Sequence, residues 1–240
     1  MLNVKIATNY EKTVLISGIV LVTLQIILFP IIQLTSWQVS MCASYLAIVL
    51  VGTFALITVL GEKIAHLIRL GILFTLVADY FLVLKDDAQL EGVIAFIAVQ
   101  LCYFAYLFVR EERRKVRVAN ALARVLLSLV LVIACYLVIG ESTDALSIVS
   151  VVYYANLVAN IIFAFTLGKE ARLFAVGLVL FAMCDLCIGL DVLFDSYLKS
   201  SDLDIFYGRY FNLPWVFYQP SQTLIALYLG RKISCIKDGD

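Results

Sequence analysis

The chain is built from long, continuous runs of apolar residues that are separated by short polar segments. The strands of a membrane barrel alternate apolar and polar positions, and these runs do not alternate. Because the hydrocarbon core of a bilayer is about 30 Å thick, a helix needs about 20 apolar residues to cross it. The pattern therefore predicts an all-α integral membrane protein, a bundle of eight transmembrane helices. The predicted spans are 13–34, 39–60, 65–84, 92–109, 118–139, 145–167, 171–190 and 212–230.

The basic residues fall on alternate connections of this eight-span arrangement. All but three of the 18 Lys and Arg lie near the two ends of the chain or near the second, fourth and sixth connections. The exceptions are Lys85, Lys199 and Arg209. Since cytoplasmic loops carry an excess of Lys and Arg, we expect both termini in the cytoplasm. We expect a multi-pass location, in the cell membrane if the source is bacterial.

Composition narrows the function classes. The chain is 63% hydrophobic and 15% charged, with zero net charge, so a nucleic-acid partner is not expected. We interpret 1–240 as a single membrane domain. Most of the six cysteines sit inside apolar runs and are expected to be buried thiols. Neither a metal nor a cofactor is expected.

Two aspartates interrupt the apolar runs. Asp79 and Asp185 each lie deep in a predicted span, and each comes eight residues after a glycine, Gly71 or Gly177. A carboxylate at the centre of a membrane helix costs about 2.5–3.5 kcal/mol on insertion scales, so such residues are usually functional. Both spans run outward in the predicted topology. The two carboxyls are therefore expected at similar depth, in the extracytoplasmic half of the membrane.

A weak internal repeat accompanies the two aspartates. An Arg-Leu pair, a glycine and an aspartate recur in both predicted spans, and the following span of each half has an aromatic residue four positions before a glutamine. Those pairs are Phe96 with Gln100 and Tyr218 with Gln222. Four spans in each half predict a possible parallel 4+4 repeat, which would explain the matched depth.

Further polar side chains occupy one face of several predicted spans. Because polar groups in a bilayer need partners within the protein, these faces are expected to turn toward one central cavity. Each of these side chains could instead have a structural role: asparagines can join helices, tyrosines can pack, and glutamines can cap a kinked backbone. The candidates for binding substrate or water are Gln100, Tyr103, Asn156, Tyr218 and Gln222.

A pair of buried carboxyls suggests two kinds of chemistry. When two carboxyls share a site they can hold one proton between them, which gives one acid and one base. That combination suits hydrolysis through an oxocarbenium-like cation, as glycosidases perform on acetals. A lipid enol ether would be a suitable substrate in a membrane. The same pair would also suit a proton-coupled transporter of small solutes.

Four segments resemble the YhhN-type, lysoplasmalogenase-like membrane proteins. They are 74–82 around Asp79, 92–103, 181–185 ending at Asp185, and 218–226. The resemblance implies an eight-span fold and cleavage of the vinyl ether of lysoplasmalogens, with Asp79 and Asp185 as catalytic acid and base. Its implied partners are a lysophospholipid substrate and membrane lipids.

The chain departs from the family pattern at three positions. Gln100 stands where the family has histidine, Ala78 where it has glycine, and Cys184 where it has serine. A glutamine amide cannot store and release a proton as an imidazole can. The alternatives to a hydrolase are therefore the proton-coupled transporter and a catalytically inactive lipid-binding membrane protein.

Overall fold

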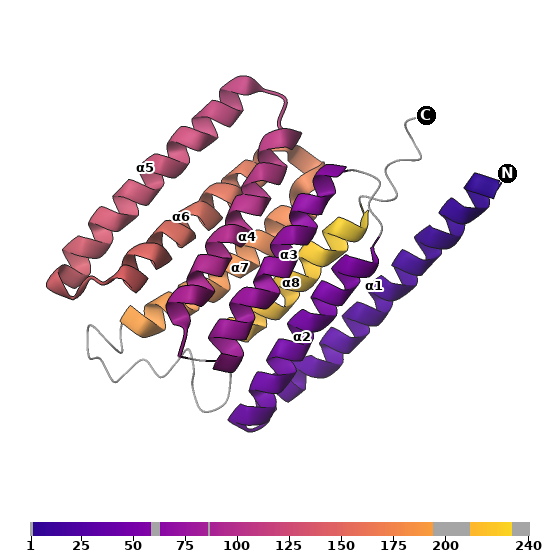
Figure 1. The fold of residues 1–240 in the computed structure, drawn as a ribbon, viewed down its shortest axis with the longest axis horizontal. Helices are drawn as coiled ribbons and strands as arrows, with labels where there is room; N and C mark the ends of the chain where they lie inside the picture. Colours follow the sequence, from indigo (N-terminus) through magenta and orange to yellow (C-terminus); the bar gives the residue numbers. More distant parts are fainter. Residues whose placement is uncertain (1, 59–62, 86, 194–211, 232–240) are drawn as a thin grey trace.

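The computed structural model describes residues 2–58, 63–85, 87–193 and 212–231, with side chains from residue 11 onward. In these segments the chain forms helices joined by short connections, and it forms no strands. The α-helices are α1 (Leu2–Leu34), α2 (Trp37–Ile57), α3 (His66–Asp79), α4 (Gln89–Arg110), α5 (Arg114–Ile139), α6 (Ala145–Thr166), α7 (Arg172–Val192) and α8 (Leu213–Arg231). They lie side by side in one bundle, with α1 and α5 at opposite edges (Figure 1).

Seven helical segments in the described part are long and apolar enough to cross a membrane. They are Glu11–Leu34, Trp37–Ile57, Lys63–Lys85, Gln89–Arg110, Arg114–Ser142, Ala145–Thr166 and Gly168–Val192. These segments match the first seven predicted spans to within a few residues. The chain is therefore a multi-pass membrane protein that contacts membrane lipids. The predicted connection from 191 to 211 lies mostly outside the described residues.

Helix α8 is the exception on hydropathy, and its surroundings explain why. Its polar side chains Gln219, Ser221, Gln222 and Thr223 are buried. The helix packs against α1, α2, α3 and α7, so these groups face protein and not lipid. A helix enclosed by other helices can carry polar residues that a lipid-facing helix cannot.

Side-chain amides of α1 connect it to α8. Gln219 donates from Nε2 to Oε1 of Gln25 at 2.7 Å, and Gln25 donates to the carbonyl oxygen of Ala47 in α2 at 2.8 Å. At the C-terminal end of α1, Gln33 Oε1 accepts the backbone N–H of Asn212 at 2.7 Å. Hydrogen bonds of this kind hold helices together in a membrane, where burial from water provides little additional force between them.

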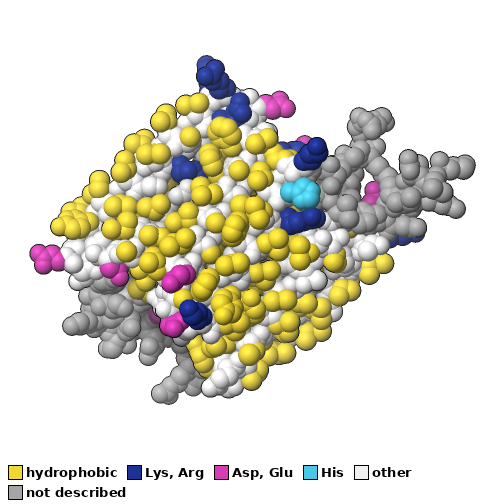
Figure 2. Space-filling view, viewed as in Figure 1, with side chains coloured by type: hydrophobic (Ala, Val, Ile, Leu, Met, Phe, Trp, Pro, Cys, Tyr) yellow, Lys and Arg dark blue, Asp and Glu magenta, His cyan; other side chains and the backbone are white. Residues whose placement is uncertain are grey.

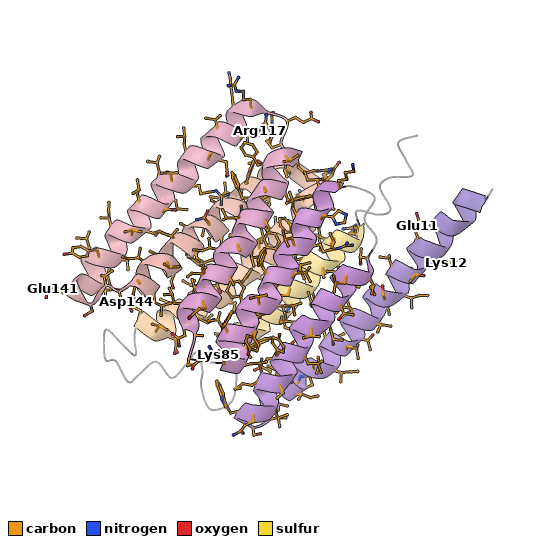
Figure 3. The ribbon with its side chains drawn as sticks, in the orientation of Figure 1. Glu11, Lys12, Lys85, Arg117, Glu141 and Asp144 are labelled. Carbon is orange, nitrogen blue, oxygen red and sulfur yellow. The ribbon has the colours of Figure 1, made fainter. Side chains whose placement is uncertain are left out.

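The charged groups separate toward the two ends of the bundle. Arg117 and Lys12 lie toward one end, whereas Lys85, Glu141 and Asp144 lie at the other (Figure 3). On the face in Figure 2, most Lys and Arg gather near the first end, and a broad apolar belt separates them from a group of acids. The apolar belt is the surface expected to contact lipid.

Local interactions organise the helix connections. Glu111, between α4 and α5, accepts hydrogen bonds from the Arg113 guanidinium at 2.8 Å, and these bonds hold the pKa of Glu111 below its ordinary value of 4.5. At the opposite end, Asp144 caps α6 by accepting the backbone N–H of Ser147 at 2.8 Å, and the Ser147 hydrogen bonds lower the pKa of Asp144.

Gly140 ends α5 with a φ of 64°, a left-handed conformation that glycine adopts without strain.

Gly177 allows α7 and α8 to approach closely. A Cβ atom at this position would lie 2.8 Å from Ile225 Cγ1 and 3.2 Å from the backbone oxygen of Ser221. The second contact involves backbone, so the helices themselves would have to separate. The glycine that precedes Asp185 by eight residues is therefore a packing residue.

We expect Gly177→Ala to lower the stability of the detergent-solubilised protein by about 1–3 kcal/mol, the usual cost of overpacking. The matched control is Gly189→Ala in the same helix, where a Cβ would meet nothing within 4 Å. Alanine favours helix by up to about 1 kcal/mol over glycine, so the control should be neutral or slightly stabilising. Thermal unfolding of both variants measures the difference, and equal melting temperatures would contradict this account.

Candidate functional site

Each of the two membrane aspartates is bound by a tyrosine from another helix. Tyr218 of α8 donates its hydroxyl to Asp79 Oδ2 at 2.6 Å, and Tyr153 of α6 donates to Asp185 Oδ2 at 2.5 Å. Asp79 is buried with 3% of its surface exposed, and Asp185 is half-buried. Phenol donors at these short distances are the strong hydrogen bonds expected for a carboxylate acceptor.

An aromatic residue joins the two pairs. The ring of Phe181 lies 5.4 Å from Tyr218 and 6.4 Å from Tyr153, measured between centroids. Phe96 of α4 closes the group, with its centroid 5.3 Å from Phe181 and 5.6 Å from Tyr153. We call these four aromatic residues with Asp79 and Asp185 the aspartate–tyrosine cluster. Five helices, α3, α4, α6, α7 and α8, contribute to it.

The helix geometry changes directly after Asp79. Asp79 is the last residue of α3, and the chain continues as a π-helical turn, Tyr80–Lys85. Single π turns are frequent at functional sites because they reorient side chains within a helix.

Unpartnered polar atoms lie next to the cluster along two of its helices. Gln222 follows Tyr218 by one turn of α8 and is fully buried, yet neither end of its amide has a hydrogen-bond partner in the described part of the protein. The same is true of Ser221 Oγ and Gln100 Nε2. Buried polar groups are almost always hydrogen-bonded, so these atoms mark where water or a polar ligand would bind.

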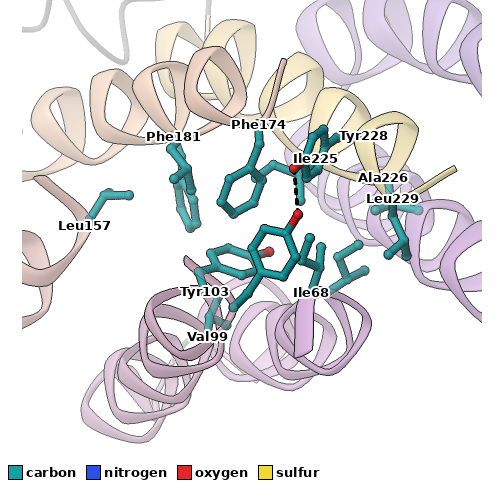
Figure 4. Close-up of a cluster of buried hydrophobic side chains, with 14 of the residues drawn as sticks. Ile68, Val99, Tyr103, Leu157, Phe174, Phe181, Ile225, Ala226, Tyr228 and Leu229 are labelled. Carbon is teal, nitrogen blue, oxygen red and sulfur yellow. Dashed lines mark hydrogen bonds between the residues drawn. The ribbon is translucent and has the colours of Figure 1, made fainter. Parts of the chain in front are cut away.

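Tyr103 belongs to a second aromatic layer, farther along α4. Its ring centroid lies 5.2 Å from that of Phe174, which stacks on Tyr228 at 5.3 Å (Figure 4). A Cβ at Gly71 would lie only 2.3 Å from the Tyr103 ring, so the glycine that precedes Asp79 also serves close packing. The structure thus places Gln100 between two aromatic layers, with Phe96 on one side and Tyr103 on the other.

The two asparagines of α6 bind an arginine that is not among the predicted site residues. Arg124 of α5 is 8% exposed and donates to Asn156 Oδ1 and to Asn160 Oδ1, both at 2.8 Å. Its guanidinium also lies 4.1 Å from the centre of the Phe104 ring. Asn156 is therefore turned toward α5, whereas Asn160 also reaches Gln100.

Arg124 is grouped in the sequence with the basic residues near the fourth connection. In the structure it lies ten residues into α5, within the span Arg114–Ser142. That is about 15 Å along a helix that rises 1.5 Å per residue. The sequence marks Arg124 in the same way as it marks the two aspartates, because each is an ionisable residue inside an apolar run.

An aromatic residue beside the cluster is also absent from the predicted set. The ring of Trp215 packs at a right angle to Tyr218 with centroids 5.2 Å apart. Among the described residues, no group of three or more His, Cys, Asp or Glu side chains could hold a metal ion.

The fold and the site define a multi-pass α-helical membrane protein with a pair of tyrosine-bound carboxyls inside its bundle. The sequence of residues 36–227 matches the model of the YhhN family, and the chain belongs to this family. The match includes both aspartates and most of α2 to α8, and it excludes α1. Comparison with curated proteins and with solved structures gives no match.

Proposed function

We propose that the protein is a membrane hydrolase that cleaves the vinyl ether of lysoplasmalogen-type lysophospholipids, with Asp79 and Asp185 as its acid–base pair. The observation that carries this proposal is the aspartate–tyrosine cluster, in which two membrane carboxyls from different helices are each bound by a tyrosine, and both tyrosine rings pack near Phe181. Membership of the YhhN family is consistent with a membrane hydrolase. Intramembrane carboxyls are costly, and stability alone gives no reason for a matched pair.

The proposed reaction needs one protonated and one ionised carboxyl. The protonated carboxyl donates its proton to the outer carbon of the vinyl ether, which leaves an oxocarbenium cation that the carboxylate stabilises. Water adds to the cationic carbon and gives its proton to the carboxylate. The resulting hemiacetal gives its hydroxyl proton to the carboxylate that first acted as the acid, and its bond to the glycerol oxygen breaks as that oxygen takes the proton held by the second carboxyl. This step releases a fatty aldehyde and a glycerophospho-base and returns both carboxyls to their starting states. The two tyrosine hydroxyls hold the carboxyls in place during these proton transfers.

The topology that we propose places this cluster in the extracytoplasmic half of the membrane. In it α8 also crosses, which makes eight spans, and the basic end of the bundle with both termini faces the cytoplasm. The start of α1 and the end of α8 lie at the same end of the bundle, as an even number of crossings requires (Figure 1). The paired glycines and aspartates of α3 and α7 support a parallel 4+4 repeat.

The proposal is tested by incubating purified protein in micelles with 1-alkenyl and, separately, 1-alkyl lysophosphoethanolamine, and trapping released aldehyde. We expect aldehyde from the alkenyl lipid only, because the alkyl ether cannot form the cation by simple protonation of carbon. No aldehyde from a range of alkenyl lysolipids would overturn the hydrolase. Proton-coupled solute flux into liposomes without aldehyde release would instead favour the transporter.

A further inference from the structure

The buried cation Arg124 has no carboxylate partner. None of the acids in the described part of the chain forms an ion pair with it. Its hydrogen bonds go to the side-chain oxygens of Asn120, Asn156 and Asn160 and to the backbone oxygen of Asn156. A charged group inside a membrane helix is expensive, and this one is fixed by neutral amides.

The charge dictates how the neighbouring amides are oriented. A guanidinium has only donors, so Asn160 must present Oδ1 to Arg124, at 2.8 Å. The amide nitrogen of Asn160 then faces α4, where it donates to the backbone oxygen and to Oε1 of Gln100, both at 2.9 Å. Since the Gln100 oxygen is engaged by this donor, its amide nitrogen is the end that remains unpaired.

That unpaired nitrogen is a donor buried beside the aspartate–tyrosine cluster. Gln100 is 0% exposed, and its Nε2 has no partner in the part of the chain that the structure describes. Phe96, one turn earlier on α4, is a member of the cluster. Arg124, on α5 at the edge of the bundle, therefore determines the orientation of the Gln100 amide through Asn160.

We propose that Arg124 is a positioning residue that acts through Asn160 to present Gln100 Nε2 as a hydrogen-bond donor to a neutral oxygen of the bound lipid, the ether oxygen at glycerol carbon 1. This inference rests on the proposed function, because it names the part of the lysolipid that this end of the site recognises. Gln100 is then a specificity-determining residue. A site that offers a buried donor discriminates against a ligand that lacks the acceptor.

We call the hydrogen bonds that link Arg124, Asn160 and Gln100 the relay. One nearly isosteric change, Asn160→Asp, should reverse which end of the Gln100 amide it presents to the ligand. The introduced carboxylate still accepts from Arg124, but it cannot donate to Gln100. The Gln100 amide then turns its nitrogen toward α6 and presents its oxygen to the ligand. The matched control is Asn156→Asp, which places the same charge against Arg124 at a residue that does not contact Gln100.

The experiment measures Kd for two non-hydrolysable probes, 1-O-hexadecyl-lysophosphatidylcholine and its isostere with CH2 in place of the ether oxygen. We expect the unmutated protein and Asn156→Asp to prefer the ether by about tenfold, and Asn160→Asp to lose or reverse that preference. An unchanged preference in Asn160→Asp, or equal loss in both variants, would overturn the relay, as would no ether preference in the unmutated protein. Arg124→Met, which frees the amides to reorient, should give an intermediate preference.

These binding measurements do not depend on turnover. An ether preference that Asn160→Asp removes, in a protein that releases no aldehyde, would support the relay and reject the hydrolase. Aldehyde release without an ether preference would support the hydrolase and reject the relay. Melting temperatures of Asn160→Asp and Asn156→Asp within a few degrees of that of the unmutated protein would show that the fold is kept.

Discussion

Replacing Asp79 with asparagine is expected to abolish aldehyde release from 1-alkenyl lysophospholipid. Asparagine keeps the size of the side chain and can still accept the Tyr218 hydroxyl, which donates to Asp79 at 2.6 Å. It cannot give or take a proton, and general acid–base catalysis typically contributes about 10²–10⁴-fold to the rate. Asp185→Asn should have a loss of similar size, because the proposed mechanism needs both carboxyls.

Variants of the two tyrosines that bind the aspartates are compared with the Asp79→Asn and Asp185→Asn variants. Tyr153→Phe and Tyr218→Phe remove only the hydrogen bonds that hold the carboxyls, so their losses should be about tenfold, well below those of the aspartate variants. The measurement is the initial rate of aldehyde release by protein that elutes as a single species in detergent. A rate for Asp79→Asn within a few-fold of the unmutated protein would remove Asp79 from the chemistry.

Asn160→Leu is expected to be among the most destabilising single changes in the protein. It removes the 2.8 Å acceptor of Arg124 and both hydrogen bonds to Gln100, and leaves a buried guanidinium with fewer partners. Loss of a hydrogen bond to a buried charge costs about 1.5–3 kcal/mol, and breaking a buried charged interaction costs up to about 3–5 kcal/mol. Thermal unfolding in one detergent measures this loss.

A second substitution identifies the buried charge as the cause. Adding Arg124→Met to Asn160→Leu should recover part of the lost stability, because it removes the uncompensated cation. Ile162→Leu, on the same helix with 57% of its surface exposed, is the neutral control. If the double variant is less stable than Asn160→Leu by the full cost of Arg124→Met alone, the two residues act independently and the interpretation is wrong.

Seven membrane helices could be predicted because hydropathy reports directly on which residues face lipid. The lipid-facing parts of α1 to α7 are continuous apolar stretches, and their bounds agree with the predicted spans. Helix α8 was predicted as a span from its apolar run, but its composition falls short because its amides face other helices. The glycines at 71 and 177 were noticed for their spacing, whereas their role in close packing depends on the positions of Tyr103 and Ile225.

The partners of the polar residues could not be predicted from helix periodicity alone. Asn156 and Asn160 both accept from Arg124 of α5, but only Asn160 also reaches Gln100 of α4. Sequence spacing does not say which neighbouring helix covers which part of a wide polar face. For the same reason, the pairing of Tyr218 with Asp79 and of Tyr153 with Asp185 required the positions of α6 and α8.

We propose above that Asp79 and Asp185 together hydrolyse a vinyl ether. The most direct measurement is aldehyde release by the purified protein from 1-alkenyl lysophospholipid in oxygen-18 water, with immediate reduction of the aldehyde to an alcohol. We predict that the alcohol carries the label, that the glycerophospho-base carries none, and that the labelled product disappears in Asp79→Asn and in Asp185→Asn. Label in the glycerophospho-base, or labelled aldehyde at an undiminished rate in either variant, would contradict the account.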